Sequence, residues 1–219
     1  MKIKIRTLAI LSLICFIQPA YAERPINEMP MYDGKHDPEV PENKEVSKGA
    51  SDLGWKYYDK GDYDTAIKRF NQAWMFNRNN PEAFWGFGVI MGIRAMEEDP
   101  EKNLNESIQY LEKAGKLLND NPRLMVDLAY SEAMLGAFLK GNQREDFQNH
   151  FNKAANLFKK SEGLEKNYPL LYSNWAILEF SEENYAVAKE KLDTAKKLGA
   201  KINPDFENEL ETKLKGTRK

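Results

Sequence analysis

The two histidines are the first residues to consider, because imidazole serves as a base and as a metal ligand at neutral pH. His36 stands near Asp33 and Asp37, and these three side chains could coordinate a cation. They lie in a proline-rich segment that would not hold ligands in a fixed geometry, so we expect no metal site there. His150 stands beside Phe151 in a helical pattern, without a second ligand at a suitable spacing. We therefore interpret His150 as a half-buried structural residue.

Other groupings that support catalysis are also missing from the sequence. The single cysteine, Cys15, lies in the N-terminal leader. The chain has no Gly-x-Ser-x-Gly motif and no glycine-rich phosphate loop. The acidic pairs Glu97-Glu98 and Glu182-Glu183 fall at expected turns, where carboxylates are normally solvated. We therefore expect a protein that is not an enzyme and that needs no cofactor and no metal.

The composition is typical of one globular domain or one short solenoid. The chain has 219 residues, of which 42% are apolar and 30% are charged. The formal net charge is −2. A protein that binds nucleic acid without regard to sequence needs a basic stripe, so this balance argues against a nucleic-acid partner.

Residues 1–22 have the pattern of a secretory signal peptide. Three basic residues precede an apolar run at 8–17. The Ala-Tyr-Ala sequence that ends the segment has the small-x-small form that a signal peptidase recognises, and it predicts cleavage between Ala22 and Glu23. The short leader resembles bacterial ones, so we expect the mature protein in a periplasm or secreted.

Two other fates of this leader are open. An uncleaved membrane anchor would need about 20 apolar residues, and the run at 8–17 is half that long. Lipidation at Cys15 would require a small residue before it, and that residue is Ile14. Ordinary cleavage is therefore favoured, and we expect no integral membrane segment in the mature chain.

Residues 23–46 form a polar tail with four prolines. Proline removes a hydrogen-bond donor and restricts the residue before it, so we expect an extended segment without a core of its own. Met29, Met31 and Tyr32 are its apolar cluster. The tail is either a flexible spacer or a short docking motif, for a partner or for the protein's own groove.

The stretch 49–81 has the pattern of two short helices joined by a tight turn. Gly54 and Tyr57 share one face of the first helix, and the turn chemistry at 61–64 follows it. Ala66 and Phe70 then begin an apolar stripe on the second helix. The small residues would let the two helix backbones approach closely, with the aromatic rings beside them.

This pattern recurs downstream at regular distances from a proline. A small residue stands fifteen positions before each proline; the small residues are Ala66, Ser107 and Ala154, and the prolines are Pro81, Pro122 and Pro169. A fourth copy begins at Ala188. The pattern resembles the tetratricopeptide repeat (TPR), a helix–turn–helix unit of about 34 residues. The resemblance implies an all-α solenoid at 47–202, with repeats at 47–80, 81–121, 122–168 and 169–202.

A last helix at 203–219 is expected to cap this solenoid. Asn203 can cap its start, and Phe206, Leu210 and Leu214 form one apolar stripe. A solenoid needs such an element because its last repeat otherwise exposes its core.

The resemblance also implies a binding surface. In TPR proteins the first helix of each repeat lines a concave groove that often holds a peptide. Here the matching positions are Ser51, Trp55, Tyr58, Asp59, Trp85, Val89, Val126, Tyr130, Met134, Ser173, Ile177 and Phe180. Some of these residues could instead belong to the core. The aromatic ones are typical anchors for a protein ligand.

Two functions follow as hypotheses. The first is a non-catalytic periplasmic adaptor that binds a protein or peptide segment in the groove. The second is a carrier of an apolar small molecule or lipid in an aromatic-lined pocket. Ser51 and Trp55 stand where some TPR domains carry residues that clamp a C-terminal carboxylate, which argues against that mode of binding.

Overall fold

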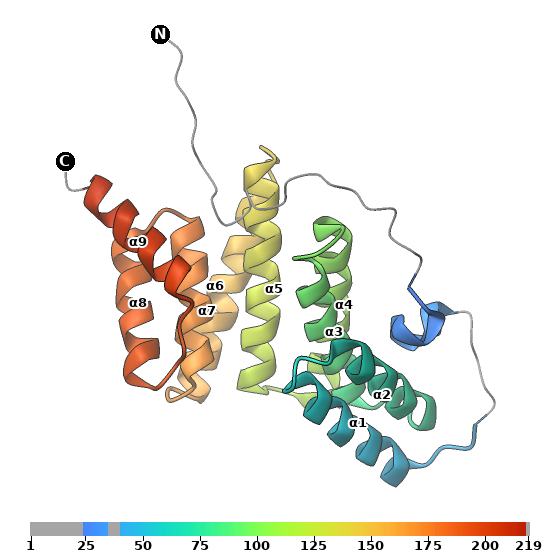
Figure 1. The fold of residues 1–219 in the computed structure, drawn as a ribbon. Coiled ribbons are helices and arrows are strands. Elements are labelled where there is room, and N and C mark those ends of the chain that lie inside the picture. The colour runs from blue at the N-terminus through green and yellow to red at the C-terminus, as the bar shows by residue number, and fades with distance from the viewer. Residues whose placement is uncertain (1–23, 35–39, 218–219) are drawn as a thin grey trace.

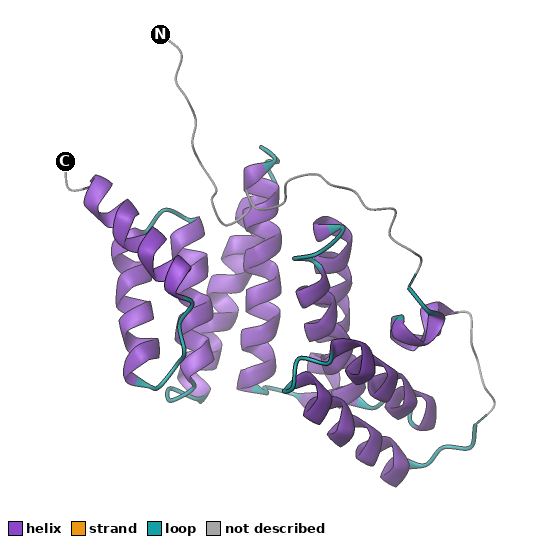
Figure 2. Cartoon of the chain, viewed as in Figure 1, coloured by secondary structure: helices purple, strands orange, loops and turns teal. Residues whose placement is uncertain are grey.

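The computed structural model describes residues 24–34 and 40–217. Within these ranges every regular element is a helix, and short loops join them (Figure 2). The α-helices are α1 (Lys44–Tyr58), α2 (Tyr63–Phe76), α3 (Pro81–Arg94), α4 (Pro100–Leu118), α5 (Pro122–Gly141), α6 (Phe147–Leu164), α7 (Pro169–Ser181), α8 (Tyr185–Lys197) and α9 (Pro204–Thr217). The predicted all-α class is confirmed.

The helices pack as consecutive pairs, α1 with α2, α3 with α4, α5 with α6 and α7 with α8 (Figure 1). The first helices of neighbouring pairs also contact one another, from α1 to α3, from α3 to α5 and from α5 to α7. This is the predicted solenoid of helix pairs. In the described ranges, no helix combines the length and the apolar character that a membrane-spanning segment needs.

Asparagine–proline pairs start two of the inner helices. The side-chain oxygen of Asn80 accepts hydrogen bonds from two backbone N–H groups in the first turn of α3, at 2.9 and 3.2 Å. Asn121 does the same for α5, at 3.1 and 3.2 Å. Pro81 and Pro122 follow at the first helical position, where a missing N–H costs nothing. These pairs mark the joints between repeats.

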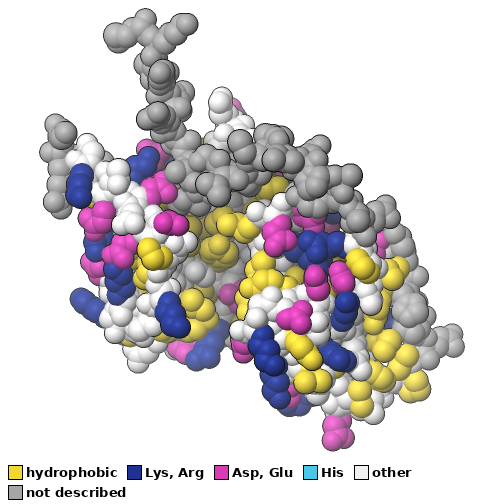
Figure 3. Space-filling view, in the orientation of Figure 1, with side chains coloured by type: hydrophobic (Ala, Val, Ile, Leu, Met, Phe, Trp, Pro, Cys, Tyr) yellow, Lys and Arg dark blue, Asp and Glu magenta, His cyan; other side chains and the backbone are white. Residues whose placement is uncertain are grey.

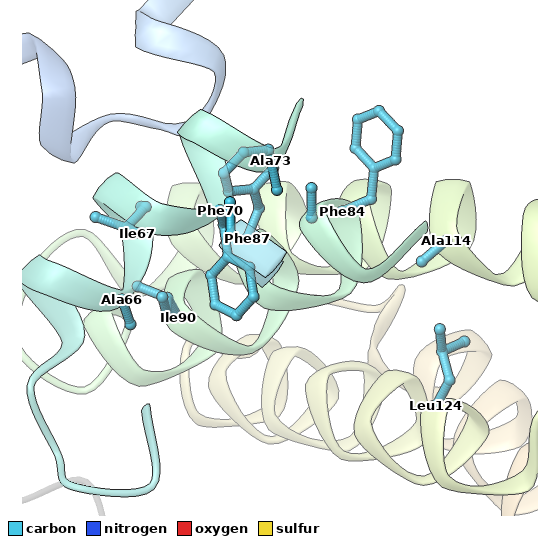
Figure 4. Packing of buried hydrophobic residues seen from close by; sticks show 11 residues of the cluster. Ala66, Ile67, Phe70, Ala73, Phe84, Phe87, Ile90, Ala114 and Leu124 are labelled. Atoms are coloured by element: carbon cyan, nitrogen blue, oxygen red, sulfur yellow. The ribbon is translucent and has the colours of Figure 1, made fainter. Parts of the chain in front are cut away.

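Glycines allow close packing around Phe70, which is fully buried (Figure 4). A Cβ atom at Gly54 would lie 2.6 Å from the Phe70 ring, and one at Gly86 would lie 2.3 Å from it. The ring of α2 thus fills space on α1 and α3 that only glycine leaves open. Gly88 meets Leu111 in the same way, since a Cβ there would lie 2.5 Å from Leu111 Cγ. Gly88 thus lets α3 and α4 approach closely at Leu111.

Helix α4 begins at Pro100 without a capping side chain at its N-cap residue. Asp99 occupies the N-cap position with φ of 39°, and its side chain makes no capping hydrogen bond. In that left-handed conformation its carboxylate does not reach the first-turn N–H groups. Asn103 makes the local bond instead, with Nδ2 donating to the Glu98 carbonyl oxygen at 2.6 Å.

Helix α9 closes the C-terminal end, as predicted. Leu210 is fully buried against Ala188 and Leu192 of α8. The Phe206 ring lies 5.4 Å from the ring of Phe180 on α7. Asn203 accepts a hydrogen bond from the backbone N–H two residues later, at 2.9 Å.

The N-terminal tail differs from the expected extended segment. Residues 26–28 and 30–34 form two short 3-10 helices, η1 (Ile26–Glu28) and η2 (Pro30–Gly34), which pack on α2. Figure 1 shows them in blue, at the edge of the molecule opposite α9. Helix α1 also begins earlier than predicted, because Asn43 caps it by accepting from the Val46 N–H at 3.0 Å. The predicted signal peptide, 1–22, lies outside the described residues.

Candidate functional site

Three aromatic side chains predicted for the groove come together on the first helices of the first two repeats. Trp55 of α1 lies with its ring 5.4 Å from the ring of Trp85 on α3 and 5.5 Å from Tyr58. Each of the three is half-buried. Figure 3 shows apolar side chains along the hollow between the two halves of the molecule, with charged side chains around it. We call Trp55, Tyr58 and Trp85, together with the residues they bond, the inner strip.

Hydrogen bonds between repeats fix the two indole rings. The Trp55 Nε1–H donates to Glu82 Oε2 on α3 at 2.7 Å. The Trp85 Nε1–H donates to Asp127 Oδ2 on α5, also at 2.7 Å. Each tryptophan therefore bonds the first helix of the next repeat. The strip is therefore held in one arrangement across three repeats.

Asp127 is an acid of the inner strip whose pKa is raised in the folded protein. Burial raises the pKa of Asp127 to about 6, and the hydrogen bond from Trp85 opposes this rise. Burial also raises the pKa of Tyr168 to about 12, and the negative charge of Asp127 adds to that effect. The pKa of Tyr58 is raised by the same two causes in the same order. Asp127 is therefore within electrostatic range of both tyrosines.

The sequence did not single out Asp127, Tyr168 or Glu82. Asp127 lies three residues before Tyr130, on the same face of its helix, and this helical period could have indicated it. Glu82 lies three residues before Trp85 in the same relation. Tyr168 directly precedes α7 as its N-cap residue, and no periodic pattern points to it.

The remaining predicted groove residues do not join this strip. Val89 packs against the same core cluster as the three rings, but no hydrogen bond or ring contact joins Val89 to the strip. Tyr130 and Ile177 pack against a separate cluster that includes Met134, which is only 8% exposed. Phe180 packs on Phe206 of the capping helix. The predicted surface thus divides into an inner strip at the N-terminal end and side chains that serve packing farther along.

Three further positions have simpler roles. Asp59 is exposed just after the end of α1. Val126 is fully buried in the core. Ser51 is 1% exposed, and it accepts a hydrogen bond from Asn80 Nδ2 at 3.1 Å. Ser51 therefore links α1 to the start of α3.

A polar depression adjoins the strip at Glu82. Its lining consists of Lys44, Lys48, Ser51, Asp52, Asn77, Asn80, Pro81 and Glu82. Both signs of charge are present, and Lys44 and Lys48 are highly exposed. The depression therefore continues the inner strip from its aromatic rings to a group of charged side chains.

His150 has the structural role that the sequence indicated. It is half-buried on α6, and its Nδ1 lies 2.5 Å from Glu132 Oε2 on α5. Lys153 Nζ donates to the other oxygen of Glu132 at 3.2 Å, and the Glu132 side chain is only 2% exposed. In the part of the chain that the structure describes, no three His, Cys, Asp or Glu side chains are arranged to hold a metal ion. His36 and Asp37 lie outside that part.

Comparisons with known proteins agree with this geometry. Residues 54–92 match the family model described as TPR repeat. A solved structure of TTC0263, a thermophilic TPR protein of Thermus thermophilus, is similar with a TM-score of 0.58 and 18% identity, over 70% of this chain and 74% of that one. A structure from the functional characterization of Pseudomonas aeruginosa pilF aligns with a TM-score of 0.35 and 16% identity, over 72% of this chain and 78% of that one. The sequence matched no curated protein. The chain thus has the fold of a TPR solenoid, and its residues 54–92 match the TPR repeat model.

Proposed function

We propose that this protein is a non-catalytic adaptor that binds a segment of a partner protein along the inner strip. TPR domains mediate protein interactions, and the surface that carries the proposal here is the strip itself. Half-buried tryptophan and tyrosine rings are typical anchors at protein interfaces. Because Trp55 and Trp85 are already fixed by hydrogen bonds, a ligand would lose little free energy in ordering them.

The chemistry of the strip favours a particular kind of segment. Its aromatic faces attract apolar side chains and also cations, which bind over the negative face of a ring. Glu82 and Asp127 add carboxylates beside the rings. We therefore expect a partner segment in which lysine or arginine alternates with apolar residues.

The proposed location is a bacterial periplasm, and the leader at 1–22 supports it. Mass spectrometry of the protein recovered from the envelope should find Glu23 at the N-terminus. A mature protein that begins at a lipidated Cys15 would contradict this location.

The alternative of a lipid or small-molecule carrier is less well supported. The rings of Trp55, Tyr58 and Trp85 pack edge to face on one another and so fill the space that a ligand pocket would need. Native mass spectrometry of the purified protein distinguishes the two functions. A copurified apolar molecule of constant mass, lost on Trp85→Ala, would favour the carrier.

Photo-crosslinking in the native host tests the adaptor function. A benzoylphenylalanine placed at Tyr58 samples the inner strip, and one placed at Val187, which is 40% exposed on α8, samples another face. We expect a discrete protein adduct from position 58 that is absent from position 187. Equal adducts from both positions, or none from position 58, would contradict the proposal.

A further inference from the structure

One carboxylate oxygen of Asp127 is open to solvent within the inner strip. The other oxygen, Oδ2, accepts the hydrogen bond from the Trp85 indole at 2.7 Å. In the part of the chain that the structure describes, Oδ1 accepts no hydrogen bond, and it is not sealed off from solvent. Asp127 is half-buried on α5, so a ligand group that lies along the strip can reach this oxygen.

The described residues leave the charge of this carboxylate unpaired. Within 24–34 and 40–217, no lysine or arginine forms an ion pair with Asp127. Arg123 stands one turn earlier on α5 but is bound by Glu165, with Nη2 donating to Oε1 at 2.8 Å and Nε donating to Oε2 at 3.1 Å. An opposite charge stabilises the ionised form of a desolvated acid. A cation from outside the chain can supply that charge.

Aromatic side chains from three elements surround the same carboxylate. Trp85 of α3 bonds it directly. Burial raises the pKa of Tyr58 on α1 and of Tyr168 at the start of α7, and the negative charge of Asp127 raises both further, which places both phenols near it. The faces of aromatic rings attract cations, and rings grouped around a carboxylate are typical of sites for ammonium and guanidinium groups.

Building on the proposed adaptor function, we propose that Asp127 binds a lysine or arginine side chain of the partner segment and that protonation of Asp127 releases it. The ionised carboxylate pairs with the cation beside the aromatic rings, whereas the protonated carboxyl group has no charge to offer. The cation and the proton therefore compete for Asp127.

The tyrosines and the ion pair around Asp127 keep their charge between about pH 5 and about pH 7. The pKa of Tyr58 is raised and that of Tyr168 is raised to about 12, so both phenols stay neutral. The hydrogen bond between Arg123 and Glu165 raises the pKa of the arginine and lowers that of the glutamate, so this pair stays ionised.

Asp127 itself changes charge within that range. Burial raises the pKa of Asp127 to about 6. The carboxylate is therefore mostly ionised at about pH 7 and mostly protonated at about pH 5. A segment that binds only the ionised form should bind about tenfold more weakly at the lower pH, because its apparent affinity scales with the ionised fraction.

The Trp85 indole N–H reports on this site, because it donates to the carboxylate that titrates. Its NMR resonance is followed against pH in n-butylammonium chloride, whose cation copies the end of a lysine side chain, and in sodium chloride of equal ionic strength. We expect a lower midpoint pH with n-butylammonium, and no titration in Asp127→Asn. Equal midpoints in the two salts would contradict the cation site whether or not a partner protein is known.

Release by protonation is measured on the protein captured through position 58. We expect the parent to lose about tenfold more affinity than Asp127→Asn between about pH 7 and about pH 5, and Glu82→Gln, at the other carboxylate of the strip, to lose as much as the parent. Equal losses in the parent and in Asp127→Asn would contradict proton release and leave the adaptor function intact. Capture of no protein at position 58 would contradict the adaptor function, and with it the partner cation, even if n-butylammonium lowers the midpoint.

Discussion

At the scale of single residues, Asp127 connects the inner strip to the pH dependence of stability. Burial raises the pKa of Asp127 to about 6 in the folded state, against an ordinary value of about 3.9. The folded state therefore holds the proton more tightly than the unfolded chain does. This contribution to stability is complete below about pH 4 and is lost progressively as the pH rises from about 4 to about 6.

Asp127→Asn should remove that titration while keeping a side-chain oxygen for the Trp85 N–H. We expect the variant to exceed the parent in free energy of unfolding by about 1–3 kcal/mol at pH 7, with the difference vanishing near pH 4. Urea denaturation at both pH values measures it, and Asp59→Asn, on an exposed side chain, is the control. A difference that is the same at both pH values would show that Asp127 does not titrate in this range.

Gly86 packs so closely on a buried ring that a larger side chain does not fit there. A Cβ atom there would lie 2.3 Å from the buried Phe70 ring, so Gly86→Ala should destabilise the fold by about 1–3 kcal/mol through overpacking. Gly49 has no atom within 4 Å of the equivalent position on α1, so Gly49→Ala should stabilise it by about 0.5–1 kcal/mol. Thermal melts of the two variants should therefore shift in opposite directions, and a shift in the same direction would contradict this packing.

At the scale of elements, helix α9 is expected to stabilise the last repeat. Leu210 is fully buried against α8, and Leu210→Ala should cost about 2–5 kcal/mol. Leu170→Ala, at a side chain that is 48% exposed, should change the free energy of unfolding by less than about 0.5 kcal/mol. If the two variants unfold at the same denaturant concentration, α9 does not stabilise the last repeat.

The helices could be predicted because their signals are local. The pairs Asn80-Pro81 and Asn121-Pro122 are typical of helix starts, and helices begin at both in the structure. The apolar stripes repeat at the helical period. Docking of the N-terminal segment was an open alternative in the sequence, but its position on α2 could not be predicted. Its fold depends on Asn71 and Arg94, which lie far along the chain and have no signature of peptide binding in the sequence.

At the scale of the whole molecule, the inner strip could be predicted only in part. Trp55, Tyr58 and Trp85 follow from the repeat register, and the structure brings them together. The later residues depend on contacts between elements that are distant in sequence. Phe180 of α7 packs against Phe206 of the capping helix, and Trp85 donates to Asp127 of the next repeat.

Removal of one aromatic anchor shows whether the inner strip binds a partner protein. Trp85→Ala combined with Asp127→Asn removes the indole without leaving a buried charge unpaired. Asp127→Asn alone and Lys159→Ala, on an exposed side chain of α6, are the matched controls. Circular dichroism of each variant establishes that the fold is retained.

The measurement is the affinity of each variant for the protein captured through position 58. A central aromatic anchor typically contributes about 2 kcal/mol or more, so the double variant should bind at least about tenfold more weakly than Asp127→Asn alone. Lys159→Ala should bind as the parent does. A folded double variant that binds with unchanged affinity would contradict the assignment of the inner strip as the partner-binding surface.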